Sequence, residues 1–122
     1  MSIRSFHDLE IHKLALTISN EIWIEVVKWD SFNKFNLGSQ LSKAADSIAL
    51  NIAEGYGRYH FKENRQFCFY ARGSLAETRS ALAMAQHRKL ISTEFFEALE
   101  KLLSTLLGRL NRYVDSIGKK YD

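Results

Sequence analysis

The chain has 122 residues, of which 46% are hydrophobic and 25% charged, with no proline, one cysteine and a formal net charge of +3. This length suits a single domain, predicted over residues 1–122, and the mixed composition excludes disordered and fibrous classes. The longest uncharged apolar stretches are too short to cross a bilayer, and the first six residues lack an apolar signal region, so we expect a cytoplasmic protein with no membrane partner.

The first predicted helix spans residues 8–29, with Asp8 as its N-cap. Residues at three- and four-residue steps form its predicted core face: Ile11, Ala15, Ile18, Ile22, Val26 and Trp29. A second apolar stripe lies on nearly the opposite side: Leu9, Leu16, Trp23 and Val27. A monomeric bundle needs one apolar face per helix, so this stripe predicts an oligomer interface. The alternative is a scatter of surface hydrophobic residues.

After a predicted polar loop at residues 30–36, a second helix is expected over residues 37–56. Its core face comprises Leu37, Leu41, Ala44 or Ala45, Ile48 and Ile52, and Gly55 and Gly57 suit a helix end or a close backbone approach.

A third helix is expected over residues 61–87. Its core face comprises Phe67, Ala71, Ser74, Leu75, Thr78, Leu82 and Ala85.

A turn at residues 88–91 precedes the fourth helix, for which Ser92 is the predicted N-cap and Gly118 the end. Its apolar face is the most regular in the chain: Phe95, Leu99, Leu102, Leu103, Leu106, Leu110, Val114 (or Tyr113) and Ile117. Four helices joined by short connections predict an all-α fold, an antiparallel up-down-up-down four-helix bundle.

The chemistry-bearing residues do not form a recognisable catalytic pattern. The four histidines are dispersed and have no metal-ligand spacing, and no nucleophile motif or phosphate-binding glycine loop is present. Cys68 lies in an aromatic-rich helical segment and is expected to be a buried free thiol. We therefore predict no catalytic residues, no metal, no cofactor and no enzymatic activity.

Positive charge is concentrated between residues 58 and 89, which hold seven basic residues and two acidic ones. Lys62, Arg65, Arg72 and Arg79 are spaced three, seven and seven apart, so they form one stripe on the third helix. Aromatic residues at the preceding corner could stack on bases. The predicted nucleic-acid-binding residues are Arg58, Tyr59, Lys62, Arg65, Arg79, Arg88 and Lys89. The alternative is a solvated face with intramolecular ion pairs.

A structural polar network is predicted from four residues beside the core faces: Asn51, Glu54, Arg72 and Glu77. Arg72 would pair with Glu54 or Glu77 and fix helix register, although a ligand contact remains open for it. Asn51 is interpreted as a hydrogen-bonding residue between helices.

Three blocks of the sequence are specific in combination: LGSQL at residues 37–41, SIALNIAEGYGR at 47–58 and ARGSLAE at 71–77. Together they resemble the bacterial 23S ribosomal RNA intervening-sequence protein family, also called the four-helix-bundle protein family. The segment FHDLE at residues 6–10 is similar to the start of that family. Ala49 stands where the family commonly has proline, and Lys43 where it has arginine; the first loop also lacks the family's proline.

The resemblance implies an antiparallel four-helix bundle that assembles into a ring-like homo-oligomer, a pentamer. It also implies genes located within ribosomal RNA intervening sequences and a relationship to accessory proteins of diversity-generating retroelements, which bind nucleic acid and a reverse transcriptase. It implies no enzymatic activity.

Two functions follow as hypotheses. The first is a homo-oligomeric module that binds nucleic acid, with RNA favoured, through the basic stripe. The second is a protein-interaction scaffold or accessory subunit, in which Phe69, Ala76 and Ala83 pack against a polypeptide partner.

Overall fold

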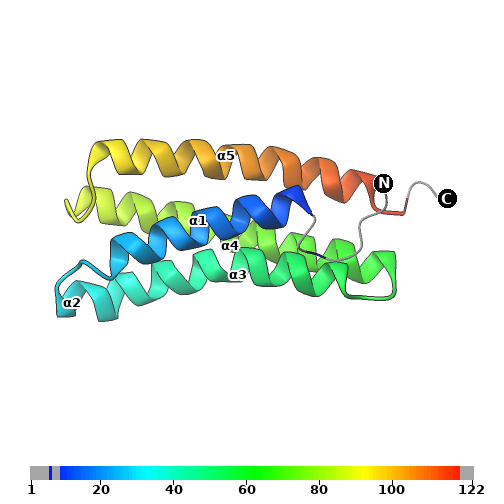
Figure 1. The fold of residues 1–122 in the computed structure, drawn as a ribbon, viewed down its shortest axis with the longest axis horizontal. Coiled ribbons are helices and arrows are strands. Elements are labelled where there is room, and N and C mark those ends of the chain that lie inside the picture. Colours follow the sequence, from blue (N-terminus) through cyan, green and yellow to red (C-terminus); the bar gives the residue numbers. More distant parts are fainter. Residues whose placement is uncertain (1–5, 7–8, 119–122) are drawn as a thin grey trace.

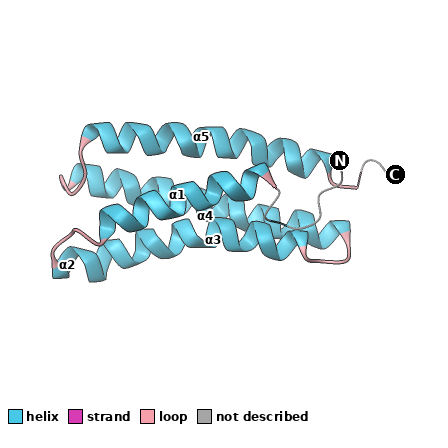
Figure 2. Cartoon of the chain, viewed as in Figure 1, coloured by secondary structure: helices cyan, strands magenta, loops and turns pink. Residues whose placement is uncertain are grey.

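Four long helices make up the computed structural model, which describes residue 6 and residues 9–118. They are α1 (Glu10–Val26), α3 (Ser39–Tyr56), α4 (Phe61–His87) and α5 (Thr93–Ser116). Between α1 and α3 lie the short α2 (Ser31–Asn33) and the π-helical segment η2 (Lys34–Gly38). Figure 2 shows helices and connecting loops only, and none of the described residues is in a strand. The all-α prediction is confirmed.

The long helices lie along one common axis, and consecutive ones run in opposite directions (Figure 1). Helix α1 packs against α3 and α5, and α4 packs against the same two helices. The α1–α3 seam therefore lies on the side of the molecule opposite the α4–α5 seam. Within the described residues, no helix has both the length and the apolarity that crossing a lipid bilayer requires.

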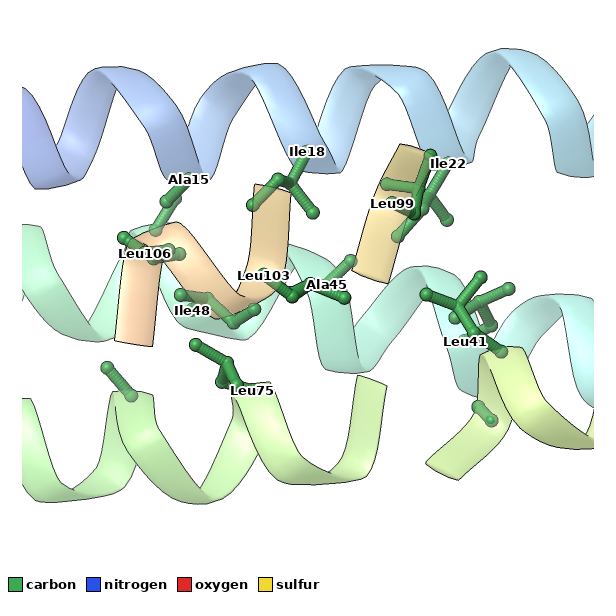
Figure 3. Packing of buried hydrophobic residues seen from close by; sticks show 14 of the residues in the cluster. Ala15, Ile18, Ile22, Leu41, Ala45, Ile48, Leu75, Leu99, Leu103 and Leu106 are labelled. Atoms are coloured by element: carbon green, nitrogen blue, oxygen red, sulfur yellow. The ribbon is translucent and has the colours of Figure 1, made fainter. Parts of the chain in front are cut away.

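The core occupies the space between all four helices. Figure 3 shows Ile18 and Ile22 of α1, Ile48 of α3, Leu75 of α4 and Leu103 of α5 pointing into the space between the helices. Every residue of the predicted core faces in α1 and α3 is buried. In α4 and α5 the predicted faces are broader than the fully buried core. Their half-buried members are Phe67, Ser74, Phe95, Leu102, Tyr113 and Val114.

The ends of α4 and the start of α5 agree with the sequence-based bounds. Helix α4 begins at Phe61 and ends at His87, and the Ser92 hydroxyl accepts a hydrogen bond of 3.0 Å from the Phe95 amide. That bond satisfies one of the amides that have no partner within the first turn of a helix. The predicted N-cap Asp8 lies outside the described residues, and α1 is shorter than expected, at Glu10–Val26.

The prediction of a polar loop at residues 30–36 is wrong, because most of this segment is helical. The Asp30 carboxylate caps α2, accepting hydrogen bonds from the Asn33 amide (3.4 Å) and the Asn33 side-chain nitrogen (2.7 Å). The bond from the Asn33 side chain lowers the pKa of Asp30. Gly38 then lies against the side chains of Val26 and Trp29, which leaves no room for a Cβ atom.

Candidate nucleic-acid interface

The seven predicted nucleic-acid-binding residues lie in three places along α4. Arg58 and Tyr59 are in the turn before α4, whereas Arg88 and Lys89 are in the turn after it. Helix α4 has 27 residues, so the two turns are separated by about 40 Å at 1.5 Å per residue. Figure 1 shows them at opposite ends of the molecule. The seven residues therefore do not converge on one compact site.

Three arginines of α4 reach across to α5, and we call this set the arginine ladder: Arg65, Arg72 and Arg79. Arg65 Nη1 donates to the Ile117 carbonyl oxygen at 2.7 Å. Arg72 Nη1 donates to Asn111 Oδ1 at 3.0 Å. The arginines follow one another at seven-residue steps, which repeat the same face of α4 every two turns. That face is the one turned toward α5.

The third member of the ladder forms a bidentate ion pair. Arg79 Nη2 lies 2.9 Å from Glu100 Oε2, and Arg79 Nε donates to Glu100 Oε1 at 3.2 Å. The Glu100 carboxylate raises the pKa of Arg79 through these hydrogen bonds and its charge. This part of the basic stripe thus forms an intramolecular ion pair. Such ion pairs are the alternative to nucleic-acid binding that the sequence left open.

Charge compensation differs along the ladder. Arg65 and Arg72 donate to a backbone carbonyl and an amide, which are neutral, and no carboxylate of the described residues forms an ion pair with either guanidinium. Arg79 alone of the three has a carboxylate partner among those residues. Within the described part of the chain, the guanidinium charges of Arg65 and Arg72 are therefore not compensated by an ion pair.

A groove of about 480 Å³ lies between α4 and α5 beside the ladder. Its lining comprises Arg72, Leu75, Ala76, Arg79, Leu107 and Asn111. The guanidinium of Arg72 also lies over the Phe69 ring, 4.9 Å from its centroid. The groove thus combines a positioned cation and an apolar floor, and the exposed Phe69 ring lies beside the groove in contact with the Arg72 guanidinium.

The corner before α4 has a different charge balance. Arg58 lies 3.6 Å from Glu54 and 3.8 Å from Glu63, and its guanidinium is 4.7 Å from the Phe67 ring centroid. Two carboxylates therefore compensate the charge of this arginine. Tyr59 and Lys62 are exposed, and Lys62 forms no ion pair with the described residues.

The predicted polar network of Asn51, Glu54, Arg72 and Glu77 does not assemble. Glu54 pairs with Arg58, and Arg72 faces Asn111 of α5. Asn51 does not bridge helices, because its side-chain nitrogen donates to the Ser47 carbonyl oxygen of its own helix at 2.8 Å. Glu77 forms no ion pair within the described part of the chain. The prediction failed because Arg72 extends toward α5, and the proposed carboxylates lie elsewhere.

The polar contacts that do form include partners that the sequence pattern did not single out, namely Asn64, Glu100 and Asn111. The Asn64 side-chain nitrogen donates to the Tyr113 hydroxyl at 3.2 Å, and the Cys68 thiol donates to Asn64 Oδ1 at 3.8 Å. Burial raises the pKa of Tyr113. The contacts of Asn64 with Tyr113, of Arg72 with Asn111 and of Arg79 with Glu100 join α4 to α5 across 21 to 49 positions of sequence, and no local spacing signals such pairs.

An exposed apolar surface follows the outer side of the α1–α3 seam. Leu16, Trp23 and Val27 of the predicted second stripe are 41%, 60% and 42% exposed. The placement of Leu9 on that stripe is wrong, because Leu9 is only 3% exposed. Its backbone is extended at the N-cap position, so the helical period does not extend to it.

Leu50 of α3, which the apolar stripe of α1 could not indicate, lies on the same side of the molecule. The Ser19 hydroxyl donates to the Asp46 carboxylate and links α1 to α3 at one level of the bundle. Leu16 lies one turn before Ser19, and Leu50 one turn after Asp46. The two helices run in opposite directions (Figure 1), so both leucines lie at the same level as the Ser19–Asp46 contact or one turn from it. Leu50 is 68% exposed. Its position off the core face of α3 is the feature of the sequence that could have indicated this exposure.

No group of three or more potential metal-ligating side chains occurs within the described ranges. Cys68 is a buried free cysteine, and burial raises the pKa of its thiol to about 11.

The sequence of the chain matches the model of a known protein family. A family model described as 23S rRNA-intervening sequence protein matches residues 7–112, which include α1, α3, α4 and most of α5. No curated protein matches the chain. The family description names an intervening sequence of ribosomal RNA and no enzymatic activity.

Proposed function

The chain belongs to the 23S rRNA-intervening sequence protein family, and from this premise we propose that it is a non-enzymatic RNA-binding protein of the cytoplasm. Its scaffold is an antiparallel up-down-up-down four-helix bundle. The observation that carries the proposal is the excess of positive charge along α4, where Arg65 and Arg72 donate to neutral acceptors.

Phosphate contacts supply most of the affinity in sequence-independent binding of nucleic acids, and exposed aromatic rings add stacking energy. Lys62 lies in the first turn of α4, three residues before Arg65, and extends the charged face toward the corner. Tyr59 at that corner is 92% exposed. Its ring is available for stacking on an unpaired base, which favours single-stranded or looped RNA over a regular duplex.

Fluorescence anisotropy with labelled single-stranded and hairpin RNAs tests the proposal. We expect binding at low salt that weakens steeply as salt rises, because RNA releases counterions when lysine and arginine neutralise its phosphates. Lys62→Glu should weaken binding about tenfold, since it reverses a charge on the binding face. Lys28→Glu, an equal charge change at an exposed position after α1, is the matched control and should have little effect. Absence of binding at low salt contradicts the proposal.

We also propose that the protein acts as a homo-oligomer, in which a second copy covers Leu16, Trp23, Val27 and Leu50. The exposure of these side chains on one side of the α1–α3 seam supports this part of the proposal. The family resemblance adds a ring-like pentamer as the specific assembly.

A protein-interaction scaffold is the second candidate function. Phe32 and Phe35, at the connection between α1 and α3, are 73% and 77% exposed, and exposed aromatic side chains are common in protein interfaces. A pull-down that recovers the same polypeptide partner before and after nuclease treatment, and that Phe35→Ser abolishes, would favour this function over RNA binding.

A further inference from the structure

In the groove between α4 and α5 a positive charge lies beside an apolar floor, and the Phe69 ring adjoins the groove through its contact with Arg72. The geometry points to this groove as a nucleotide subsite, in which Arg72 binds a phosphate of single-stranded RNA and the adjoining base lies against Phe69 and the groove floor. This inference rests on the proposed RNA-binding function and assigns a place to it.

Arg72 is positioned before any ligand arrives. Asn111 Oδ1 holds its Nη1 atom at 3.0 Å, and the Phe69 ring supports the guanidinium plane at 4.9 Å. A guanidinium carries five N–H donors, and the bond to Asn111 is the one hydrogen bond that Arg72 makes within the described residues. Several donors in a fixed orientation thus remain for a phosphate, which arginine binds in a bidentate manner.

Arg79, at the other side of the groove, has a different role. Both oxygens of Glu100 accept hydrogen bonds from the Arg79 guanidinium. The Glu100 carboxylate therefore compensates the charge of Arg79 and occupies two of its donors. The floor between the two arginines consists of Leu75, Ala76 and Leu107, which offer no polar side chain. A base can therefore lie on the floor while its phosphate binds at the Arg72 end.

The second uncompensated charge lies further along the same face. Arg65 precedes Arg72 by seven residues, which is about 10 Å along the axis of α4. A flexible phosphate backbone can reach both guanidinium groups in succession. Planar bases also stack on arginine and aromatic side chains whatever their sequence. An acidic peptide would gain the charge contacts and would leave the Phe69 ring unused, so RNA fits the groove better.

Two nearly isosteric substitutions change the charge of this groove in opposite directions. Asn111→Asp keeps the acceptor for Arg72 and turns the contact into an ion pair, so the link between α4 and α5 is retained. We expect RNA affinity to fall about fivefold to tenfold and the slope of log affinity against log salt to drop by about one. Glu100→Gln removes the carboxylate beside Arg79, and RNA affinity should rise several-fold.

Matched controls separate the groove from net charge. Asn36→Asp in η2 and Glu21→Gln in α1 make the same charge changes at exposed positions, and each should alter affinity less than about twofold. Phe69→Leu leaves the charge unchanged and should weaken RNA binding several-fold by removing the ring. Circular dichroism melting of each variant verifies that the bundle is folded.

The outcomes distinguish this inference from the broader proposal. If Asn111→Asp and Asn36→Asp weaken RNA binding equally, RNA binding stands and the groove subsite is overturned. If the wild type binds no RNA, both are overturned. If poly-glutamate binds, responds to Asn111→Asp and is not displaced by RNA, the groove is a site for acidic protein and the inference is again overturned.

Discussion

At the scale of single residues, Gly55 allows α3 to approach α4 closely. A Cβ atom at this position would lie 2.8 Å from Asn64 Oδ1, 2.9 Å from the Phe67 Cβ and 3.0 Å from the Asn64 carbonyl oxygen. One of these neighbours is backbone and another is a Cβ, so neither can rotate away. The contact holds the start of α4, where Asn64 also meets Tyr113 of α5.

We therefore expect Gly55→Ala to lower the free energy of unfolding by about 1–2 kcal/mol, as overpacking outweighs the better helix propensity of alanine. Gly73→Ala is the matched control, because Gly73 is exposed in α4 and a Cβ there meets nothing within 4 Å. It should raise stability by about 0.5–1 kcal/mol. Urea denaturation measures both values, and a loss of stability in Gly73→Ala equal to that in Gly55→Ala would contradict the close-approach argument.

Cys68 makes stability depend on alkaline pH. Burial raises the pKa of its thiol from 9.0 to about 11, so the native state keeps the proton that the unfolded state loses between these values. The free energy of unfolding should therefore be unaffected by this group below pH 9 and should decrease between pH 9 and 11, by roughly 1–3 kcal/mol.

Cys68→Ala provides the control for that pH dependence. The variant loses some packing at all pH values, but its stability should decrease less steeply between pH 9 and 11 than that of the wild type. Parallel curves for the two proteins, measured by urea denaturation at each pH, would contradict the role of the thiol.

At the scale of elements, α4 ends in a left-handed turn that contains no glycine. Lys89 has a φ of 62°, and its amide donates to the Gln86 carbonyl oxygen while the Leu90 amide donates to that of Ala85. This pair of bonds is the Schellman arrangement, in which the left-handed position usually holds glycine. A lysine there strains the backbone, because its Cβ crowds the following carbonyl.

Lys89→Gly is accordingly expected to raise the free energy of unfolding by about 0.5–1 kcal/mol. Arg88→Gly removes the same charge from the preceding residue, whose φ of −85° suits any side chain, and should not stabilise the protein. Thermal unfolding of both variants compares them directly. An unchanged melting temperature in Lys89→Gly would indicate that the turn carries no strain.

The sequence predicted those features of the helices that depend on local periodicity. The core faces of α1 and α3 and both ends of α4 follow from apolar spacing and from the breaks at Gly57 and residues 88–91. The segment at residues 30–38 was missed, although Asp30 is an ordinary capping residue. The π-helical turn there ends at Gly38, which packs against Val26 and Trp29, and this tertiary contact has no local signal.

The sequence predicted the residues of the candidate nucleic-acid interface only as a basic stripe along α4. Spacing alone placed three arginines on one face of α4, and the structure shows that this face meets α5. Their partners could not be predicted, since Asn111 is 39 residues away from Arg72 in sequence. The difference between an arginine compensated by Glu100 and one held by a neutral amide is likewise invisible without the fold.

At the scale of the whole molecule, the exposed apolar surface predicts self-association. Leu16 and Trp23 are 41% and 60% exposed on the outer side of α1. Light scattering coupled to size-exclusion chromatography should give a multimer for the wild type and a monomer for the double variant Leu16→Asp, Trp23→Asp, because buried charges without partners destabilise an interface. A monomeric wild type contradicts the prediction.

Met84→Asp supplies the control for that experiment. Met84 is 45% exposed on α4, away from the α1–α3 seam, and its substitution should leave the multimer intact. Dissociation by Met84→Asp alone would instead place the interface on α4.

The opposite placement of the two seams has a consequence for affinity. If copies associate through the α1–α3 side alone, each α4–α5 groove faces away from that contact, and the assembly is multivalent. Once one groove holds an RNA, the neighbouring grooves meet the same strand at a high effective concentration, and avidity can exceed the affinity of one groove by about 10²–10⁴-fold. A weak subsite on a small bundle would then suffice to retain a long RNA, and short oligonucleotides would dissociate quickly from the same protein.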